Sequence, residues 1–207
     1  DFEVTGVSIP GVPLVMIGHN RSIAWGATLS YADIQDTYIE KFTGPSCLQY
    51  YCGDRILKST KREEKILIKG QAAHVFDAIQ THHGPVILDI DDRTKISLAS
   101  KALQQNEMMF GFYNLNRADN WDDFVGACAQ LSIPSLSLVY ADTSQNIGYY
   151  MTGEVPVRNK SKGLLPNHGF DGKQEWTGRV PFEAMPHCYN PQKGYFYTCN
   201  HRIVDQN

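Results

Sequence analysis

The chain has 207 residues, of which 42% are hydrophobic and 20% are charged, and it carries a net charge of -3 at pH 7. This composition is typical of a globular protein with a sizeable core, and it excludes a disordered chain or a collagen-like repeat. No run of Lys or Arg supplies the positive field on which nucleic-acid binding depends, so we expect no nucleic-acid partner.

Two further features limit the classes of protein to which the chain can belong. The longest apolar stretch, residues 12–17, is far shorter than the ~20 residues that a membrane-spanning helix needs, so we expect no membrane partner. The chain begins at Asp1 without a Met or a leader, and we interpret it as a processed or excerpted piece. The missing leader therefore says nothing about the compartment.

Alternating apolar and polar residues, broken by turns rich in Gly, Pro, Asn and Asp, predict a mostly antiparallel β protein. In chain order, the expected strands are residues 12–18, 22–28 and 36–42, followed by hairpins that pair 64–69 with 73–79, 85–90 with 95–100, and 136–140 with 147–151. A single domain with one or two helices is expected.

The clearest helix is predicted to begin near Asn120. Apolar residues at positions 121, 124, 125, 128 and 131 fall on one face at helical spacing, and Asp119 or Asn120 can cap the first turn. Residues 156–191 are rich in Gly, Pro, Asn and Lys and are expected to form a long ordered loop.

The spacing of polar residues excludes most common catalytic and nucleotide-binding motifs. The chain contains no GxSxG, SxxK, HExxH, CxxC or GxGxxG motif and no phosphate-binding GxxxxGK[ST] loop. Asp89 and Asp91 are interpreted as a solvated turn, because the Gly and the closing Glu of a calcium loop are missing.

Four soft ligands near the end of the chain, His187, Cys188, Cys199 and His201, suggest zinc, although their spacing matches no usual zinc pattern. The favoured alternative is that the two cysteines face one another across a hairpin centred on residues 191–193, either bonded or merely packed.

Two other pairs of residues carry potential ligands. Cys47 and Cys52 leave a disulfide and two free thiols equally open. His82 and His83, which precede Gly84, are interpreted as part of a turn rather than as a site.

Several ordered blocks carry a family resemblance. Residues 10–36 read PGVPLVMIGHNRSIAWGATLSYADIQD, and further blocks follow at 140–149, 153–158, 176–183, 189–195 and Asn200. Together these blocks resemble the β-chain of the penicillin acylase family, the N-terminal-nucleophile amidohydrolases that include penicillin G, cephalosporin and homoserine-lactone acylases.

The resemblance implies an α+β fold, the αββα sandwich of N-terminal-nucleophile hydrolases, in which residues 1–207 form the central part of the β-chain. In this family the β-chain's own N-terminal Ser attacks the substrate, and its α-amine acts as the base. Asp1 cannot take that part. We therefore expect the nucleophile and the α-chain to lie outside these residues, and the piece alone to be inactive.

The resemblance also assigns the residues that stabilise charge. Asn200 matches the Asn whose side-chain amide donates to the oxyanion, and Leu29 matches the position whose backbone N–H is the second donor. Without the resemblance, Asn200 would be interpreted as a hairpin cap and Leu29 as core.

The resemblance also assigns binding roles to further residues of this chain. Apolar side chains expected to line the acyl pocket are Met16, Ile17, Ala27, Phe112 and Leu136. Asp33, the carbonyl group of Gln35, and Asp36 resemble the family's calcium-binding segment, for which an acidic turn is the alternative. No other cofactor is expected.

The function implied by the resemblance is hydrolysis of a linear amide, a small-molecule N-acyl substrate of the penicillin or acyl-homoserine-lactone type, through an acyl-enzyme. The implied partners are the α-chain and the remaining β-chain segments of the same precursor, and the implied location is periplasmic or secreted. The alternative is a non-catalytic binding or structural module derived from this fold.

Overall fold

A computed structural model of the protein describes residues 3–104 and 108–203. It is mostly antiparallel β with two α-helices, as predicted. The sequence predicts a single domain, whereas the structure divides into two compact units. The first comprises Asp1–Asp33, Gln104–Val155 and Arg179–Asn207, and the second comprises Ile34–Leu103 and Pro156–Gly178.

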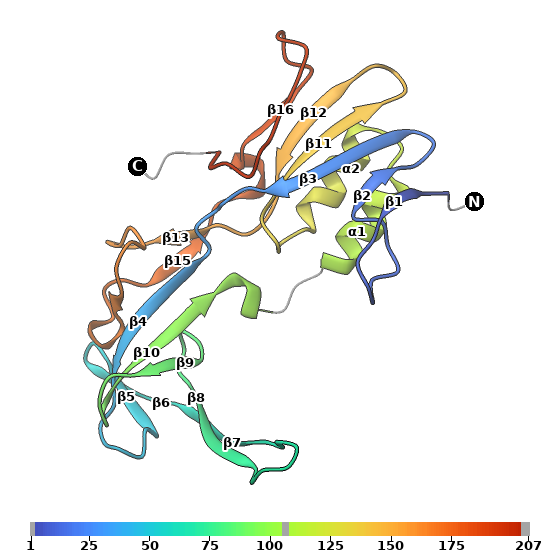
Figure 1. The fold of residues 1–207 in the computed structure, drawn as a ribbon. Coiled ribbons are helices and arrows are strands. Elements are labelled where there is room, and N and C mark those ends of the chain that lie inside the picture. Colours follow the sequence, from blue (N-terminus) through green and yellow to red (C-terminus); the bar gives the residue numbers. More distant parts are fainter. Residues whose placement is uncertain (1–2, 105–107, 204–207) are drawn as a thin grey trace. The chain divides into compact units, whose positions relative to one another are not determined.

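The first unit is built on a six-stranded antiparallel sheet (Figure 1). In spatial order its strands are β1 (Thr5–Val7), β2 (Ile17–His19), β3 (Ile23–Leu29), β11 (Leu136–Asp142), β12 (Ile147–Met151) and β16 (His187–Tyr189). β3 and β11 pair along their whole length, with Leu29 opposite Leu136 and Ile23 opposite Asp142.

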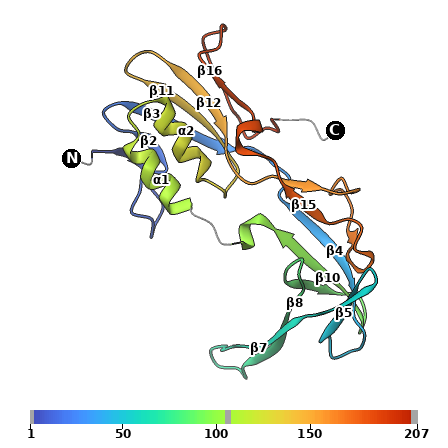
Figure 2. The ribbon, with the colours of Figure 1, turned by 180° about the vertical axis from the view of Figure 1, so that it is seen from behind.

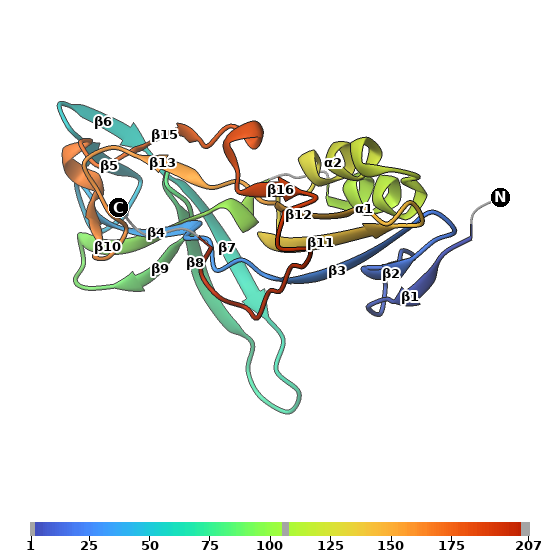
Figure 3. The ribbon, with the colours of Figure 1, turned by 90° about the horizontal axis from the view of Figure 1, so that it is seen from above.

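Two helices, α1 (Met108–Arg117) and α2 (Trp121–Ala129), cover one face of this sheet, as Figures 2 and 3 show. The core between the two layers contains Phe112 and Phe124 from the helices and Trp25 and Leu138 from the strands, all of them buried. The first turn of α2 is capped as predicted, because the Asn120 side chain accepts the backbone N–H of Asp123 at 3.0 Å.

The second unit is built on a four-stranded sheet. Its strands, in spatial order, are β14 (Asn167–His168), β4 (Gln35–Lys41), β10 (Thr94–Ser100) and β9 (Val86–Asp89). Three two-stranded pairs accompany it: β5 (Gln49–Cys52) with β6 (Arg55–Lys58), β7 (Thr60–Ile66) with β8 (His74–Gln80), and β13 (Pro156–Arg158) with β15 (Trp176–Arg179). Single 3-10 turns lie at Lys101–Leu103, Gly169–Asp171 and Phe182–Ala184.

The three predicted hairpins are confirmed, but the strand predicted for residues 12–18 is wrong over most of its length. Only its last two residues belong to β2. Before them, the Asn116 side chain accepts the Val15 N–H at 2.8 Å and donates to the Val15 carbonyl oxygen at 2.7 Å. A side-chain amide thus satisfies the backbone groups for which a strand would need a neighbouring strand.

The loop predicted for residues 156–191 is also wrong, since it contains β13, β14, β15 and β16. β14 pairs with β4 and β16 pairs with β12, and both partners are distant in the sequence. No local pattern predicts such short strands. Among the described residues, no helix has the length and apolar character needed to cross a membrane.

The cap of α2 gives a first test. Replacing Asn120 with Ala removes the acceptor of the Asp123 N–H, so we expect the free energy of unfolding to fall by about 1 kcal/mol, measured by urea denaturation. Asn120→Ser keeps an acceptor and is the matched control, for which a much smaller loss is expected. Equal losses in the two variants would contradict the capping role.

Candidate functional site

The predicted oxyanion residues lie together in the first unit. The backbone N–H of Leu29, the last residue of β3, donates to Oδ1 of Asn200 at 3.0 Å. A second contact joins the same segments, since the hydroxyls of Thr28 and Thr198 lie 2.6 Å apart. Both Leu29 and Asn200 are exposed, so this contact lies at the surface of the unit.

Strand geometry explains why the Leu29 N–H is available to a side chain. The next residue, Ser30, donates its N–H to the Ser135 carbonyl oxygen beside β11. Successive N–H groups of a strand point to opposite sides, so the Leu29 N–H points away from β11. On that side β2 pairs with β3 at Ala24 and Trp25 and ends before Leu29 is reached.

Asn200 itself has a left-handed backbone, with φ of 53°. Asn adopts this conformation more readily than most residues, and strained backbone of this kind often occurs at functional sites. Because a backbone N–H must meet an acceptor, the amide oxygen rather than the amide nitrogen faces Leu29. The Asn200 side chain therefore satisfies the backbone N–H at the end of β3.

Four of the five predicted acyl-pocket residues belong to the core of the first unit. Phe112 and Leu136 are buried members of that core, and Met16 and Ala27 pack against it. Ile17 does not belong to this core, because its position on β2 leaves it 41% exposed. The structure thus gathers the four apolar residues around one core.

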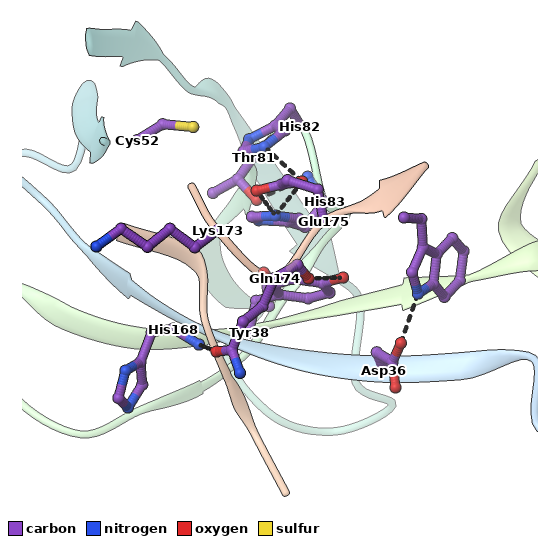
Figure 4. Close-up of polar contacts among 12 residues, drawn as sticks. Asp36, Tyr38, Cys52, Thr81, His82, His83, His168, Lys173, Gln174 and Glu175 are labelled. Carbon is purple, nitrogen blue, oxygen red and sulfur yellow. Dashed lines mark hydrogen bonds and ion pairs between the residues drawn. The ribbon is translucent and has the colours of Figure 1, made fainter. Parts of the chain in front are cut away.

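The three predicted calcium ligands fall in different settings. Asp33 ends the first unit, and Gln35 and Asp36 belong to the second. The Gln35 side chain donates to Ser100 Oγ at 2.9 Å. Oδ2 of Asp36 accepts from Arg158 Nε at 2.8 Å and from the Trp176 indole (Figure 4).

Oδ1 of Asp36 is buried and has no hydrogen-bond partner among the residues that the structure describes. A buried carboxylate oxygen without a partner is costly, and a hard oxygen of this kind suits calcium. Oδ1 of Asp36 could therefore serve as a cation ligand, while Oδ2 accepts hydrogen bonds from Arg158 and Trp176.

A second cluster of polar residues lies in the second unit, around His83. The Nδ1 atom of His83 lies 2.8 Å from Oε1 of Glu40, and its Nε2 atom lies 3.1 Å from both carboxylate oxygens of Glu175. The imidazole, whose side chain is 4% exposed, also stacks on Tyr38 with ring centroids 3.7 Å apart. Figure 4 shows His82, His83 and Glu175 side by side.

Glu40 is the most deeply buried member of this cluster. Its Oε1 accepts from the hydroxyls of Thr81 and Ser97, each at 2.7 Å, as well as facing His83. Its carboxylate is fully buried, so the charge depends on these partners. β4 and β10 present Glu40 and Ser97 side by side, and the loop after β8 adds Thr81 and His83.

His82 and His83 do lie in a turn, as predicted, since Thr81 and Gly84 exchange backbone hydrogen bonds, but the turn also places His83 in a buried polar cluster. His83 meets partners 43 and 92 residues away in the sequence. A pair of adjacent histidines next to Gly84 was the only sequence signal, and nothing local indicates that Glu40 and Glu175 approach it. Sequence reasoning missed the cluster for that reason.

All five cysteines are free thiols. The free-thiol alternative therefore holds for Cys47 and Cys52, and Cys188 is not bonded to Cys199. Cys188 lies on β16, opposite Tyr149 of β12, and no hairpin pairs it with Cys199 within the described residues. Of the described His, Cys and acidic residues, those that gather in threes close enough to hold a metal ion do not include His187 or His201. The zinc alternative at the end of the chain is therefore not supported.

Comparison with known proteins places this chain in a family. All of it, residues 1–207, matches the family model described as penicillin amidase. The chain belongs to the penicillin amidase family. The predicted family is therefore confirmed.

Two relatives illustrate the similarity. The chain is 33% identical to the acyl-homoserine lactone acylase QuiP of Pseudomonas aeruginosa, over 98% of this chain and 26% of the relative. It is also 33% identical to penicillin G acylase of Escherichia coli, over 96% of this chain and 24% of the relative. The chain thus spans about a quarter of the length of these relatives.

A solved structure supports the fold. The thermostable penicillin G acylase from Alcaligenes faecalis matches this chain with a TM-score of 0.86 and 32% identity, covering 98% of this chain and 37% of that one. The predicted N-terminal-nucleophile hydrolase fold class is therefore confirmed.

The charged states of His83, Glu40 and Glu175 stabilise one another. Hydrogen bonds from His82 and His83 lower the pKa of Glu175 to about 2. Burial favours neutral His83, but hydrogen bonds to Glu175 and Glu40 outweigh it and raise its pKa above the ordinary 6.5. Burial also opposes ionised Glu40, yet hydrogen bonds from His83, Ser97 and Thr81 hold its pKa below the ordinary value. Both carboxylates are thus favoured as anions and His83 as a cation.

These shifts predict a pH window for stability. The raised pKa of His83 contributes stability that is present below pH 6.5 and is lost as the pH rises through the folded-state value. The lowered pKa of Glu175 contributes stability that is present above pH 4.5 and is lost as the pH falls toward about 2. Both contributions are complete between pH 4.5 and 6.5.

Glu40→Gln tests this ion pair, because Gln keeps an oxygen for Thr81 and Ser97 but removes the charge facing His83. We expect the free energy of unfolding to fall by about 3 kcal/mol at pH 6, measured by urea denaturation with a chelator present. The loss should shrink as the pH rises and wild-type His83 becomes neutral.

The matched control is Glu63→Gln at an exposed position of β7, which should change stability by less than about 0.5 kcal/mol. If Glu40→Gln cost the same at pH 6 and pH 9, a cationic His83 would be excluded.

Proposed function

We propose that the protein containing this chain hydrolyses a linear N-acyl amide, of the penicillin or acyl-homoserine-lactone type, through an acyl-enzyme. The main observation in support of this proposal is the hydrogen bond from the Leu29 N–H to the Asn200 side-chain amide. Family membership supports the proposal, as do relatives named acyl-homoserine lactone acylase and penicillin G acylase.

Asn200 and Leu29 would act on the developing negative charge. When a hydroxyl oxygen attacks the amide carbon, the C–O π electrons move to the carbonyl oxygen, and two donors at that oxygen lower the barrier. Turning the Asn200 amide away from Leu29 would free the backbone N–H and aim Nδ2 at the same oxygen. The α-amine of the attacking residue would take the hydroxyl proton and pass it to the amine nitrogen as the C–N bond breaks. Water then attacks the resulting ester, which releases the acid and restores the hydroxyl.

The attacking hydroxyl would come from an N-terminal Ser in a segment that these 207 residues do not include. Support comes from the sequence resemblance and from a relative named penicillin acylase 2 proenzyme, of Pseudomonas sp. (strain SE83), which is 31% identical over 98% of this chain. A name of this kind refers to a precursor. We infer that these residues alone lack activity and that the α-chain and other β-chain segments complete the site.

The acyl group would occupy apolar surroundings near the end of β3. Ala27, Phe112 and Leu136 share one core with Met16, so an aliphatic or aromatic acyl chain would meet apolar side chains there. Ile17 would contribute from the exposed strand β2. Leu29, which is 49% exposed, would narrow the entrance with its side chain while its N–H acts as a donor.

Calcium is a further part of this proposal. The unpartnered Oδ1 atom of Asp36 would be one ligand, and the carbonyl group of Gln35 would be another, assigned by resemblance. A periplasmic or secreted location is proposed on the same resemblance.

Asn200→Ala tests the oxyanion role in a longer protein that includes the nucleophile. We expect kcat for amide hydrolysis to fall about 100- to 1,000-fold with a small change in KM, because the donor acts mainly in the transition state. Asn190→Ala is the matched control, since Asn190 has the same left-handed backbone but bonds to Ile147 and Asn146. Unchanged turnover in Asn200→Ala would remove the assignment.

Leu29→Ala tests the entrance to the acyl pocket. The shorter side chain leaves the backbone N–H in place, so we expect kcat/KM to rise for bulkier acyl groups relative to small ones, measured with a series of N-acyl substrates. Leu48→Ala, at a 54% exposed position of the second unit, is the control and should leave the order of substrates unchanged. The same order in both variants would contradict a role for Leu29 in specificity.

A further inference from the structure

We propose that Cys52, His82 and Glu175 bind a zinc ion in the second unit. One ligand atom from each residue, a thiol sulfur, an imidazole nitrogen and a carboxylate oxygen, lies within 4.8 Å of the other two. In Figure 4 the Cys52 sulfur points toward His82 and Glu175. This proposal does not depend on the proposed amidase function.

The three residues come from different segments, and each segment is held in place by the backbone. Cys52 ends β5, and the next residue, Gly53, donates its N–H to the Phe170 carbonyl oxygen at 2.9 Å. His82 lies in a turn closed by hydrogen bonds between Thr81 and Gly84. The ligands therefore converge because the backbone brings them together.

The His82 ring is oriented as a metal ligand requires. Its Nδ1 atom lies 2.9 Å from the hydroxyl of Tyr50, which also accepts the His82 backbone N–H at 2.8 Å. Nε2 therefore faces the cluster, 3.5 Å from Oε2 of Glu175. Metal-binding histidines commonly use one ring nitrogen for the ion and a hydrogen bond at the other to fix the ring.

Glu175 is oriented by a chain of buried groups. Its two oxygens face Nε2 of His83, whose Nδ1 faces the fully buried Glu40. Such a carboxylate–histidine–carboxylate arrangement holds the outer carboxylate in one position, as the supporting residues of metal sites do. The approach of the ion would be from solvent, because the side chains of His82 and Glu175 are 35% and 31% exposed.

The donor set selects zinc over the hard cations. A thiolate and an imidazole suit zinc, whereas calcium and magnesium prefer oxygen ligands alone. Zinc with three protein ligands takes water in the fourth position. Bond lengths of about 2.0 to 2.3 Å require the three atoms to approach one another slightly, which side-chain rotation supplies.

One neighbouring charge opposes the ion. The guanidinium group of Arg55 lies 3.7 Å from the Cys52 sulfur. Arg55 is exposed, so its side chain can turn into solvent when the cation binds. The negative charges of Glu175 and the Cys52 thiolate then face the ion.

The test is zinc binding by the purified protein. Metals are first removed with a chelator, and zinc is then added back and its excess removed. We expect one zinc per chain by elemental analysis, a higher melting temperature with zinc, and a thiolate-to-cobalt absorption band when cobalt replaces zinc. Cys52→Ser should abolish the band, and His82→Gln should weaken zinc binding at least about tenfold. Cys47→Ser, which removes another buried free thiol, is the matched control and should keep both properties.

Circular dichroism identifies any variant that fails to fold, and Glu175→Gln, which keeps the size and an acceptor oxygen, then replaces it in the comparison. A wild-type protein that takes up no zinc would overturn the proposal. It would also be overturned by a cobalt band that survives Cys52→Ser, or by one that disappears only when Cys188 or Cys199 is replaced.

Discussion

The pairing of β3 with β11 is the constraint on which the first unit depends. Their register sets Trp25 opposite Tyr140 and Leu29 opposite Leu136. A shift by one residue would turn every apolar side chain of β3 from the helix-covered face to the other face, so burial fixes the register. The same register turns the Leu29 N–H away from β11, which makes it available to Asn200. Core packing and the candidate oxyanion site therefore have one cause.

The second unit depends on a different kind of constraint. It buries a carboxylate, Glu40, whose desolvation is offset by His83 and two hydroxyl groups. Because those partners come from β10 and from the loop after β8, the charge links segments that hydrophobic packing alone would leave less precisely placed. Glu175 extends this arrangement to the surface, beside His82 and Cys52.

The two candidate sites differ in how they relate to the family. The contact between Leu29 and Asn200 involves the residues to which family resemblance assigns the oxyanion donors, so its test is the proposed amide hydrolysis. The cluster of Cys52, His82 and Glu175 rests on geometry within this chain and carries its own test. Each site is confined to one unit, so neither argument requires the other.

The sequence by itself determined the family, the antiparallel character, the three hairpins and the cap of α2, because these depend on ordered motifs and on contacts between residues close in the chain. It also named Leu29 and Asn200, through motifs rather than through spacing. Only the tertiary structure decided that Val15 bonds to a helix side chain, that β14 and β16 are strands, and that His83 lies between two carboxylates. These features join residues far apart in sequence, and no local periodicity encodes which distant partner satisfies a buried polar group.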